Sequence, residues 1–472
     1  MELSKKYYFV LISFFIILSS LGIESTKEET PRTGKHFVLI HGACLGAWSW
    51  YKLETLLKSS GHNVTALDLG ASGINPLQLN DLQSSSDYFK PLRDFMEALP
   101  FHERVILVGH SYGGYAISQA MEYFPSKISV AVFATAYMPG PTLNYSTLNQ
   151  MRVSQQGPQL DSHYTYDQGP NNPPTTFIFG PLYSASDLFP LSPIEDLTLA
   201  TLLLRPLRLF SDEDLSKQLM LSTKKYGSVK RVFIIAEKDK AIKRDIQLWM
   251  IERNPPNDVV EIKGSDHMNQ VINSIKLPFV SDLLSLHLDI EIQQGPLLDS
   301  HYTYDQGPNN PPTTFIFGPL YLASDVFQLS PIESFNLQGP LLDSHYTYDQ
   351  GPNNPPTTLP VYLASDVFQL SPIEDLTLAT LLLRPLRLFS DEDLSKQLML
   401  SSENYGSVKQ VYIISKKDKV ARRDLQLWMI ERNPPNDVVE IKGSDHMVMM
   451  SKPIELWAHL QGIAEKYSYP IF

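Results

Sequence analysis

The strongest pattern in this sequence is Arg104-Val-Ile-Leu-Val-Gly-His-Ser-Tyr-Gly-Gly-Tyr115. A short apolar run, typical of a buried strand, leads directly into Gly109-His-Ser-Tyr-Gly113, and a helical pattern follows over Tyr112 to Phe124. A G-x-S-x-G motif between a strand and a helix is typical of a nucleophile elbow, because the glycines let the main chain turn sharply and present the serine hydroxyl. The pattern predicts that Ser111 is a catalytic nucleophile.

Apolar runs and amphipathic stretches alternate on both sides of this segment. Strands are predicted at His36–Ile40, Val64–Asp68, Lys127–Phe133, Lys230–Ile235 and Asp258–Ile262, and helices at Tyr88–Leu99 and Ile242–Glu252 among others. Strands that alternate with helices and are almost wholly apolar indicate a mostly parallel sheet covered by helices on both faces. The sequence therefore predicts an α/β fold.

Composition limits the classes of partner. The chain has 472 residues, 43% of them hydrophobic and 19% charged, with a formal net charge of −12. The negative charge argues against nucleic acid or an anionic membrane as the main partner. Cys44 is the single cysteine, which excludes an intrachain disulfide and a cysteine zinc site. We expect no metal partner.

The first 25 residues differ from the rest. Lys5 and Lys6 precede an apolar run from Tyr7 to Leu18, and small residues follow. This arrangement is typical of a secretory signal peptide. The apolar run is shorter than the roughly 20 residues that a membrane-spanning helix needs. We interpret residues 1–25 as a signal peptide, with an N-terminal anchor as the alternative. The predicted location is the secretory route or the exterior if the signal is used, and the cytoplasm otherwise.

The second half of the chain repeats part of the first. Prolines and glycines interrupt all periodicity over about residues 139–206, which predicts a lid inserted in a hydrolase-like domain of residues 36–290. Residues 291–338 repeat part of that lid, and residues 339–472 repeat the lid and the strands after it. G-x-S-x-G occurs once in the sequence, so the duplicated cassette lacks a nucleophile.

A serine nucleophile needs a histidine base and an acid that orients the base, and after an elbow they follow in the order Ser, Asp, His. Asp239 directly follows a predicted strand, and His267 follows the next one. Asp418 and His446 occupy the same places in the second cassette. Oxyanion donors are expected at the backbone amides of Tyr112 and Ala43, which follow the nucleophile and the first strand respectively.

Loop-closure entropy favours the first Asp–His pair over the second by only roughly 0.8 kcal/mol. We choose Asp239 and His267 because their cassette continues from the first lid and is synthesised earlier. The alternative partners are Asp418 and His446. The duplicated cassette, left without a sheet of its own, could swap into a second copy and form a homodimer, dock beside the first domain, or remain partly disordered.

These motifs together resemble the plant methylesterase and hydroxynitrile lyase family of α/β-hydrolases, which includes salicylic-acid-binding esterases. The resemblance rests on His41-Gly-Ala-Cys44, Gly46-Ala-Trp-Ser-Trp-Tyr-Lys-Leu53, Val64-Thr-Ala-Leu-Asp-Leu69, Val105-Ile-Leu-Val-Gly-His-Ser-Tyr-Gly-Gly114, Gly227-Ser-Val-Lys-Arg-Val232 and Ile262-Lys-Gly-Ser-Asp-His-Met268. It implies an α/β-hydrolase fold with a helical lid, a small apolar pocket and no cofactor. It also implies hydrolysis of methyl esters of hormone acids such as salicylate, jasmonate and indole-3-acetate.

Departures from the family pattern separate the candidate functions. The lyases place a threonine where Ala43 stands and a lysine after the catalytic histidine, where this chain has Met268 and Met447. Without that positive charge a departing cyanide would be left unstabilised, so the sequence favours the esterase. The other alternative is a protein that binds the free hormone acid with little or no turnover. Two further residues differ from those of family members: Leu45 at a pocket position and Gln159 in the lid.

Overall fold

The computed structural model describes residues 34–154, 157–268, 363–383, 400–401 and 405–467. The predicted signal peptide and the partial lid repeat of residues 291–338 lie outside the described residues. None of the helices in the described part of the chain has the length and apolar character needed to cross a bilayer.

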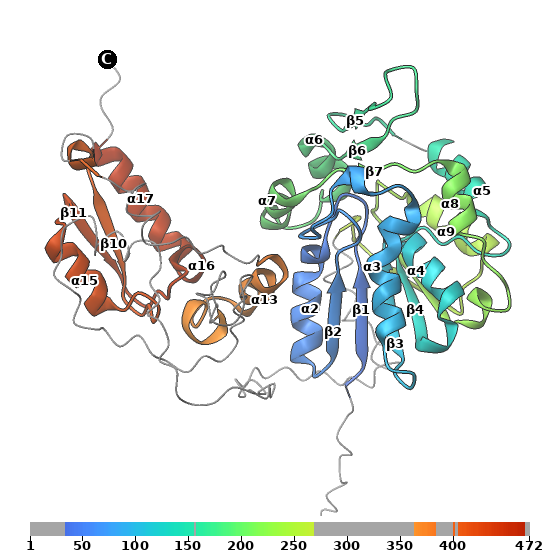
Figure 1. Cartoon of the computed structure of the whole chain (residues 1–472), viewed down its shortest axis with the longest axis horizontal. Coiled ribbons are helices and arrows are strands. Elements are labelled where there is room, and N and C mark those ends of the chain that lie inside the picture. The colour runs from blue at the N-terminus through green and yellow to red at the C-terminus, as the bar shows by residue number, and fades with distance from the viewer. Residues whose placement is uncertain (1–33, 155–156, 269–362, 384–399, 402–404, 468–472) are drawn as a thin grey trace, which may run out of the picture.

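The main sheet is parallel throughout, and its first four strands lie side by side in Figure 1. Within the described residues it has the strand order β2-β1-β3-β4-β8-β9. The strands are β1 (His36–Ile40), β2 (Asn63–Leu67), β3 (Val105–His110), β4 (Ile128–Ala134), β8 (Arg231–Ala236) and β9 (Asp258–Ile262). All residues of β3 are buried, as expected for a central strand covered on both faces. The predicted α/β fold is confirmed.

Alternating residues of the strands feed two apolar cores, one on each face of the sheet. On β1, Val38 and Ile40 join the core that contains α3 and α4, whereas Phe37 and Leu39 join the core beneath α2. The helices of this domain outside the lid are α2 (Tyr51–Ser59), α3 (Ser85–Ala98), α4 (Gly113–Tyr123), α8 (Asp212–Gln218) and α9 (Arg244–Arg253). The two-residue alternation of a strand thus places neighbouring apolar side chains in opposite cores.

Helix α3 begins earlier than the predicted start at Tyr88. The reason is a capping box: the Ser84 amide donates to Asp87 Oδ2 at 2.9 Å, and the Ser84 side chain accepts from the amide of the third helical residue. These bonds satisfy amides that would otherwise lack a partner at the helix start. Ser85 to Asp87 are polar and therefore add nothing to the apolar periodicity.

The lid contains more regular structure than its sequence indicates. Helix α5 (Tyr145–Ser154), the short helix α6 (Pro181–Tyr183) and helix α7 (Ile194–Leu203) accompany a small antiparallel sheet of order β5-β6-β7. The strands are β5 (His163–Thr165), β6 (Thr176–Ile178) and β7 (Leu207–Arg208). Strands this short cannot produce a recognisable alternation, which is why the sequence pattern missed them.

The duplicated cassette forms its own small sheet, in contrast to the expectation that its strands would lack one. Within the described residues, β10 (Val411–Ser415) pairs in parallel with β11 (Asp437–Ile441). The associated helices are α13 (Ile373–Leu382), α15 (Arg423–Arg432), α16 (Val448–Ser451) and α17 (Pro453–Tyr467). Apolar side chains of α17 stay exposed, as expected for a cassette without the full sheet: Ile454 is 78% and Trp457 63% exposed.

Helix α13 packs directly against α2 of the first domain (Figure 1). The hydroxyl of Thr55 on α2 donates to that of Thr377 on α13 at 2.8 Å, in a buried contact. Leu378 and Leu382 pack against the apolar cluster that contains Trp48. The repeated lid helix therefore docks alongside the first domain.

Candidate active site

Ser111 sits at a strained turn between β3 and α4. Its φ is +51°, a left-handed conformation that costs energy for a residue with a side chain. The glycines around it are required by close backbone approaches. A Cβ on Gly113 would lie 2.6 Å from the carbonyl oxygen of His41, and one on Gly114 would lie 2.1 Å from that of Tyr137. The elbow predicted from the sequence is present.

Asp239 and His267 are brought together by the loops after β8 and β9. His267 Nδ1 lies 2.8 Å from Asp239 Oδ2, and both side chains are almost fully buried. A carboxylate only accepts hydrogen bonds, so Nδ1 carries the proton and Nε2 is left as the basic nitrogen. This is the tautomer that a general base for a serine requires.

Asp239 accepts three further hydrogen bonds besides that from His267. Its Oδ1 accepts from the amides of Ala241 and Ile242, each at 2.8 Å, and its Oδ2 also accepts from the hydroxyl of Thr135. Thr135 follows β4 and has a φ of +40°. The sequence analysis missed Thr135, because nothing in the local pattern after β4 marks it.

His110, the residue before Ser111, contacts His267 through its ring. Its Nε2 donates to the backbone oxygen of His267 at 3.0 Å, and the two rings lie 4.7 Å apart between centroids. Burial and the neighbouring His267 hold the pKa of His110 well below its usual value, so the ring is neutral. The residue before Ser111 is therefore tied to the loop that carries His267.

The loop after β1 lies against Ser111. A Cβ on Gly42 would be 2.9 Å from Ser111 Cβ, and Cys44 turns the chain with a φ of +63°. In the described part of the chain, the amides of Ala43 and Tyr112 have no hydrogen-bond acceptor. Two unpaired amides beside a serine are the donors expected for a developing oxyanion.

Comparison with known proteins agrees with this geometry. Residues 37–272 match the family model described as "Alpha/beta hydrolase family". The chain belongs to the α/β-hydrolase family.

Among relatives of this hydrolase, methyl jasmonate esterase 1 of Vitis vinifera is 55% identical over 235 residues, which is 50% of this chain and 90% of the relative. Salicylic acid-binding protein 2 of Nicotiana tabacum is 45% identical over 249 residues, 52% of this chain and 95% of the relative. The crystal structure of tomato methylketone synthase I with 2-tridecanone aligns with a TM-score of 0.51 at 54% identity, covering 53% of this chain and 97% of that one. The resemblance to plant methylesterases expected from the motifs is confirmed.

Cys44 of this hydrolase is part of the core rather than of the reacting groups. Its thiol is buried and donates to the carbonyl oxygen of Phe177 at 3.4 Å. Burial raises the pKa of Cys44 to about 12, which keeps the thiol protonated and unreactive. The interpretation of Cys44 as a small core residue agrees with this position.

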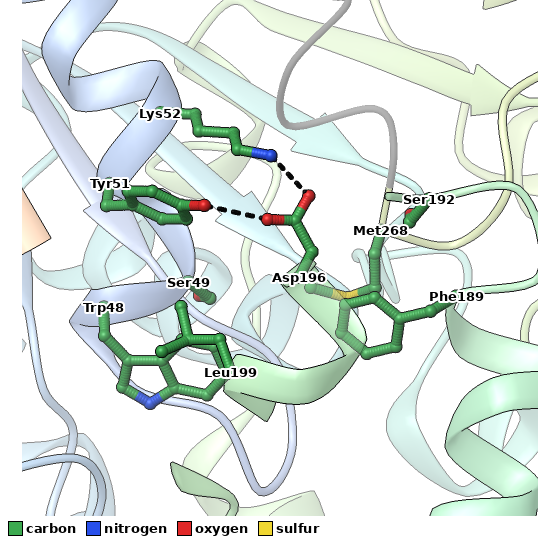
Figure 2. Close-up of a pocket in the computed structure, with 9 residues that line it drawn as sticks. All are labelled: Trp48, Ser49, Tyr51, Lys52, Phe189, Ser192, Asp196, Leu199 and Met268. Atoms are coloured by element: carbon green, nitrogen blue, oxygen red, sulfur yellow. Dashed lines mark hydrogen bonds and ion pairs between the residues drawn. The ribbon is translucent and has the colours of Figure 1, made fainter. Parts of the chain in front are cut away.

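A small pocket lies between α2 and the lid helix α7, close to Met268 (Figure 2). Its volume of about 20 Å³ is room for about one water, and none of the predicted triad residues lines it. Asp196 of α7 points toward Tyr51 and Lys52 of α2 and accepts hydrogen bonds from them at 2.8 and 2.7 Å. The pocket lies where Asp196 of the lid is hydrogen-bonded to α2.

The second Asp–His pair of this hydrolase is formed by the loops that follow the strands of the separate two-stranded sheet. His446 Nδ1 lies 3.0 Å from Asp418 Oδ2, and Asp418 Oδ1 accepts from the amides of Val420 and Ala421. Ser111, Asp239 and His267 thus follow strands of the main sheet, whereas Asp418 and His446 follow β10 and β11 of the separate two-stranded sheet. No group of three or more metal-ligating side chains occurs among the described residues.

Proposed function

We propose that this α/β-hydrolase is a serine carboxylesterase that hydrolyses methyl esters of small plant hormone acids. The observation that carries the proposal is the buried His267–Asp239 pair, held at 2.8 Å and tied through His110 to the elbow that presents Ser111. A buried Asp–His pair of this kind, with the proton on Nδ1, supports the assignment of His267 as the base for Ser111.

In the proposed reaction, His267 Nε2 takes the proton of the Ser111 hydroxyl as its oxygen attacks the ester carbonyl carbon. The carbonyl oxygen becomes an oxyanion, which the amides of Ala43 and Tyr112 stabilise. The tetrahedral intermediate collapses, the bond to the methoxy group breaks, and His267 returns the proton so that methanol leaves. Water then attacks the acyl carbon with His267 again as base. The bond between the acyl carbon and the Ser111 oxygen breaks, His267 returns the proton to that oxygen, and the free acid departs.

Methyl jasmonate is the first substrate we propose, since the relative named for it is 55% identical, compared with 45% for the salicylic acid-binding protein. Methyl salicylate and methyl indole-3-acetate are the next candidates. A lyase is disfavoured because the side chain after His267 is apolar. Met268 is buried in a cluster with Trp48 and Phe189 and brings no positive charge for a departing cyanide.

The experiment that tests this function is a substrate panel with the purified full-length chain. Methanol and free acid are measured from the three methyl esters, cyanide from mandelonitrile, and binding of the free acids by calorimetry. We expect steady ester turnover without cyanide release. Acid binding with no turnover would replace the esterase with a hormone-binding protein, and cyanide release would replace it with a lyase.

A further inference from the structure

The segment of the lid just before α7 is hydrogen-bonded to the loop that carries His267, the proposed base. Leu191 and Ser192, which precede α7, both hydrogen-bond to the carboxylate of Asp266. The Leu191 amide donates to Oδ2 at 2.7 Å, and the Ser192 hydroxyl lies 3.1 Å from each oxygen. We call the pair Leu191–Ser192 the lid strap. Asp266 directly precedes His267 in sequence, so the lid strap is linked to the proposed base through Asp266 alone.

The same carboxylate also fixes the backbone around His267. Asp266 Oδ1 accepts from the amide of Met268 at 3.1 Å, which closes a turn over His267. On the opposite side, His110 Nε2 donates to the backbone oxygen of His267. The main chain of the base is therefore held between the elbow and the lid strap, and Asp266 is the group that connects it to the lid.

We propose that Asp266 is a positioning residue that couples attachment of the lid to the orientation of His267. This rests on the proposed esterase function. Asp266 is 0% exposed, so its carboxylate depends on protein donors for its hydrogen bonds. If the lid strap moves away, the carboxylate loses donors that water cannot replace without opening the loop. The turn over His267 then loosens at the same time.

The duplicated cassette contains an independent copy of this arrangement. Asp445 precedes His446, is also fully buried, and accepts from the Leu370 amide at 2.8 Å and the Ser371 hydroxyl at 2.9 Å. The Met447 amide closes the same turn at 3.1 Å. This copy forms beside β10 and β11 without a nucleophile strand. The same contacts between the lid residues, the buried aspartate and the histidine loop thus occur in both copies. We infer that these local contacts are sufficient to link the lid to the histidine.

The test compares Asp266→Asn with the matched control Asp445→Asn in the full-length chain. The amide keeps the size of the carboxylate, but its nitrogen cannot accept from the strap or from Met268. The concentration of active sites is titrated with paraoxon, which phosphorylates a reactive serine, and methyl ester turnover is then expressed per titrated site. A purely structural defect lowers the number of sites, whereas misplacement of the base lowers the rate at each site.

We expect Asp266→Asn to lower kcat per titrated site by about tenfold to a hundredfold, the range for a reacting group displaced by about an ångström. The phosphorylation rate should fall with kcat, and Asp445→Asn should leave both unchanged. Wild-type rates per site in Asp266→Asn, or an equal loss in Asp445→Asn, would overturn the proposal. If the wild type itself hydrolyses no ester, the proposed function fails, and the phosphorylation rate still decides the role of Asp266.

Ser192→Ala keeps the test decisive if Asp266→Asn does not fold. It removes one strap donor and should lower the per-site kcat more than twofold, while Ser371→Ala does not. Where Asp266→Asn does fold, the double variant Ser192→Ala/Asp266→Asn should be no slower than Asp266→Asn alone, because both changes break one link. An unchanged rate in Ser192→Ala, or losses that simply multiply, would contradict the coupling.

Discussion

Asparagine in place of Asp239 tests the assignment of the acid with almost no change in shape. The amide oxygen can take over the role of Oδ1, which accepts from the amides of Ala241 and Ile242 at 2.8 Å. The amide nitrogen then faces His267 Nδ1, where Oδ2 stood at 2.8 Å. Because this nitrogen can only donate, the ring must protonate Nε2 instead of Nδ1. The proposed base nitrogen, Nε2, then carries the proton and can no longer take the one from Ser111.

The expected result is a decrease in kcat of about 10⁴-fold, the size seen when this substitution reverses the tautomer of a triad histidine. That corresponds to about 5.5 kcal/mol of transition-state stabilisation, at about 1.36 kcal/mol for each factor of ten. The assay is methanol release from methyl jasmonate at saturating ester, with thermal unfolding as the check that the fold is intact.

Asp418→Asn is the matched control, because Asp418 makes the corresponding contacts to His446 and to two amides in the second cassette. It should retain wild-type kcat. A folded Asp239→Asn variant with more than a tenth of wild-type kcat would refute the assignment. So would a comparable loss in Asp418→Asn, which would show that the second cassette completes the site.

Three further predictions concern stability. Gly114→Ala should prevent folding or lower the melting temperature strongly, because the new Cβ would lie 2.1 Å from a backbone oxygen, and soluble yield with wild-type melting would contradict this. Burial lowers the pKa of His41 and His110, so both take up protons on unfolding below pH 6.5. The free energy of unfolding should therefore fall with decreasing pH by up to about 1.4 kcal/mol per pH unit for each histidine, and a flat denaturant-unfolding profile from pH 6.5 to 5 would refute it. Thr377→Val should weaken docking of α13 on α2 by about 1 kcal/mol, which would be measured as faster hydrogen exchange in α13. Thr198→Val changes the corresponding exposed position of α7, which has the same sequence, and should leave hydrogen exchange in α13 unchanged.

The sheet and the elbow could be predicted because their patterns are local. Strand β9 has the predicted bounds Asp258–Ile262, and the apolar run before Gly109 is the buried strand β3. The order of Asp239 and His267 after successive strands places them at the same edge of a parallel sheet. Each of these inferences needs only periodicity, turn residues and the order of elements along the chain.

The contacts that support the site could not be predicted. Thr135 bonds to Asp239 and His110 bonds to the backbone of His267, in each case across about a hundred residues or more of sequence. A pattern contains no information about which distant carbonyl a buried ring will face. His110 stood inside the elbow motif, but its role depends on the position of a loop that follows β9.

The repeated lid helix is a second case in which sequence alone does not determine the contacts. Helices α7 and α13 have the same ten-residue sequence, yet α7 buries Asp196 and Ala200, whereas α13 buries Thr377. A helix rich in leucine on several sides has no single apolar face, so its surroundings decide which side is covered. Sequence alone therefore left three arrangements open for the duplicated cassette.

The central claim is that Ser111, with His267 and Asp239, hydrolyses a methyl ester. The most direct measurement is methanol release from methyl jasmonate by the full-length chain and by Ser111→Ala, at equal concentration of folded protein. We predict steady release by the wild type and loss of kcat by at least about 10³-fold in the variant. Equal rates in the two proteins would contradict the account, because the reaction would then not depend on the serine at the elbow.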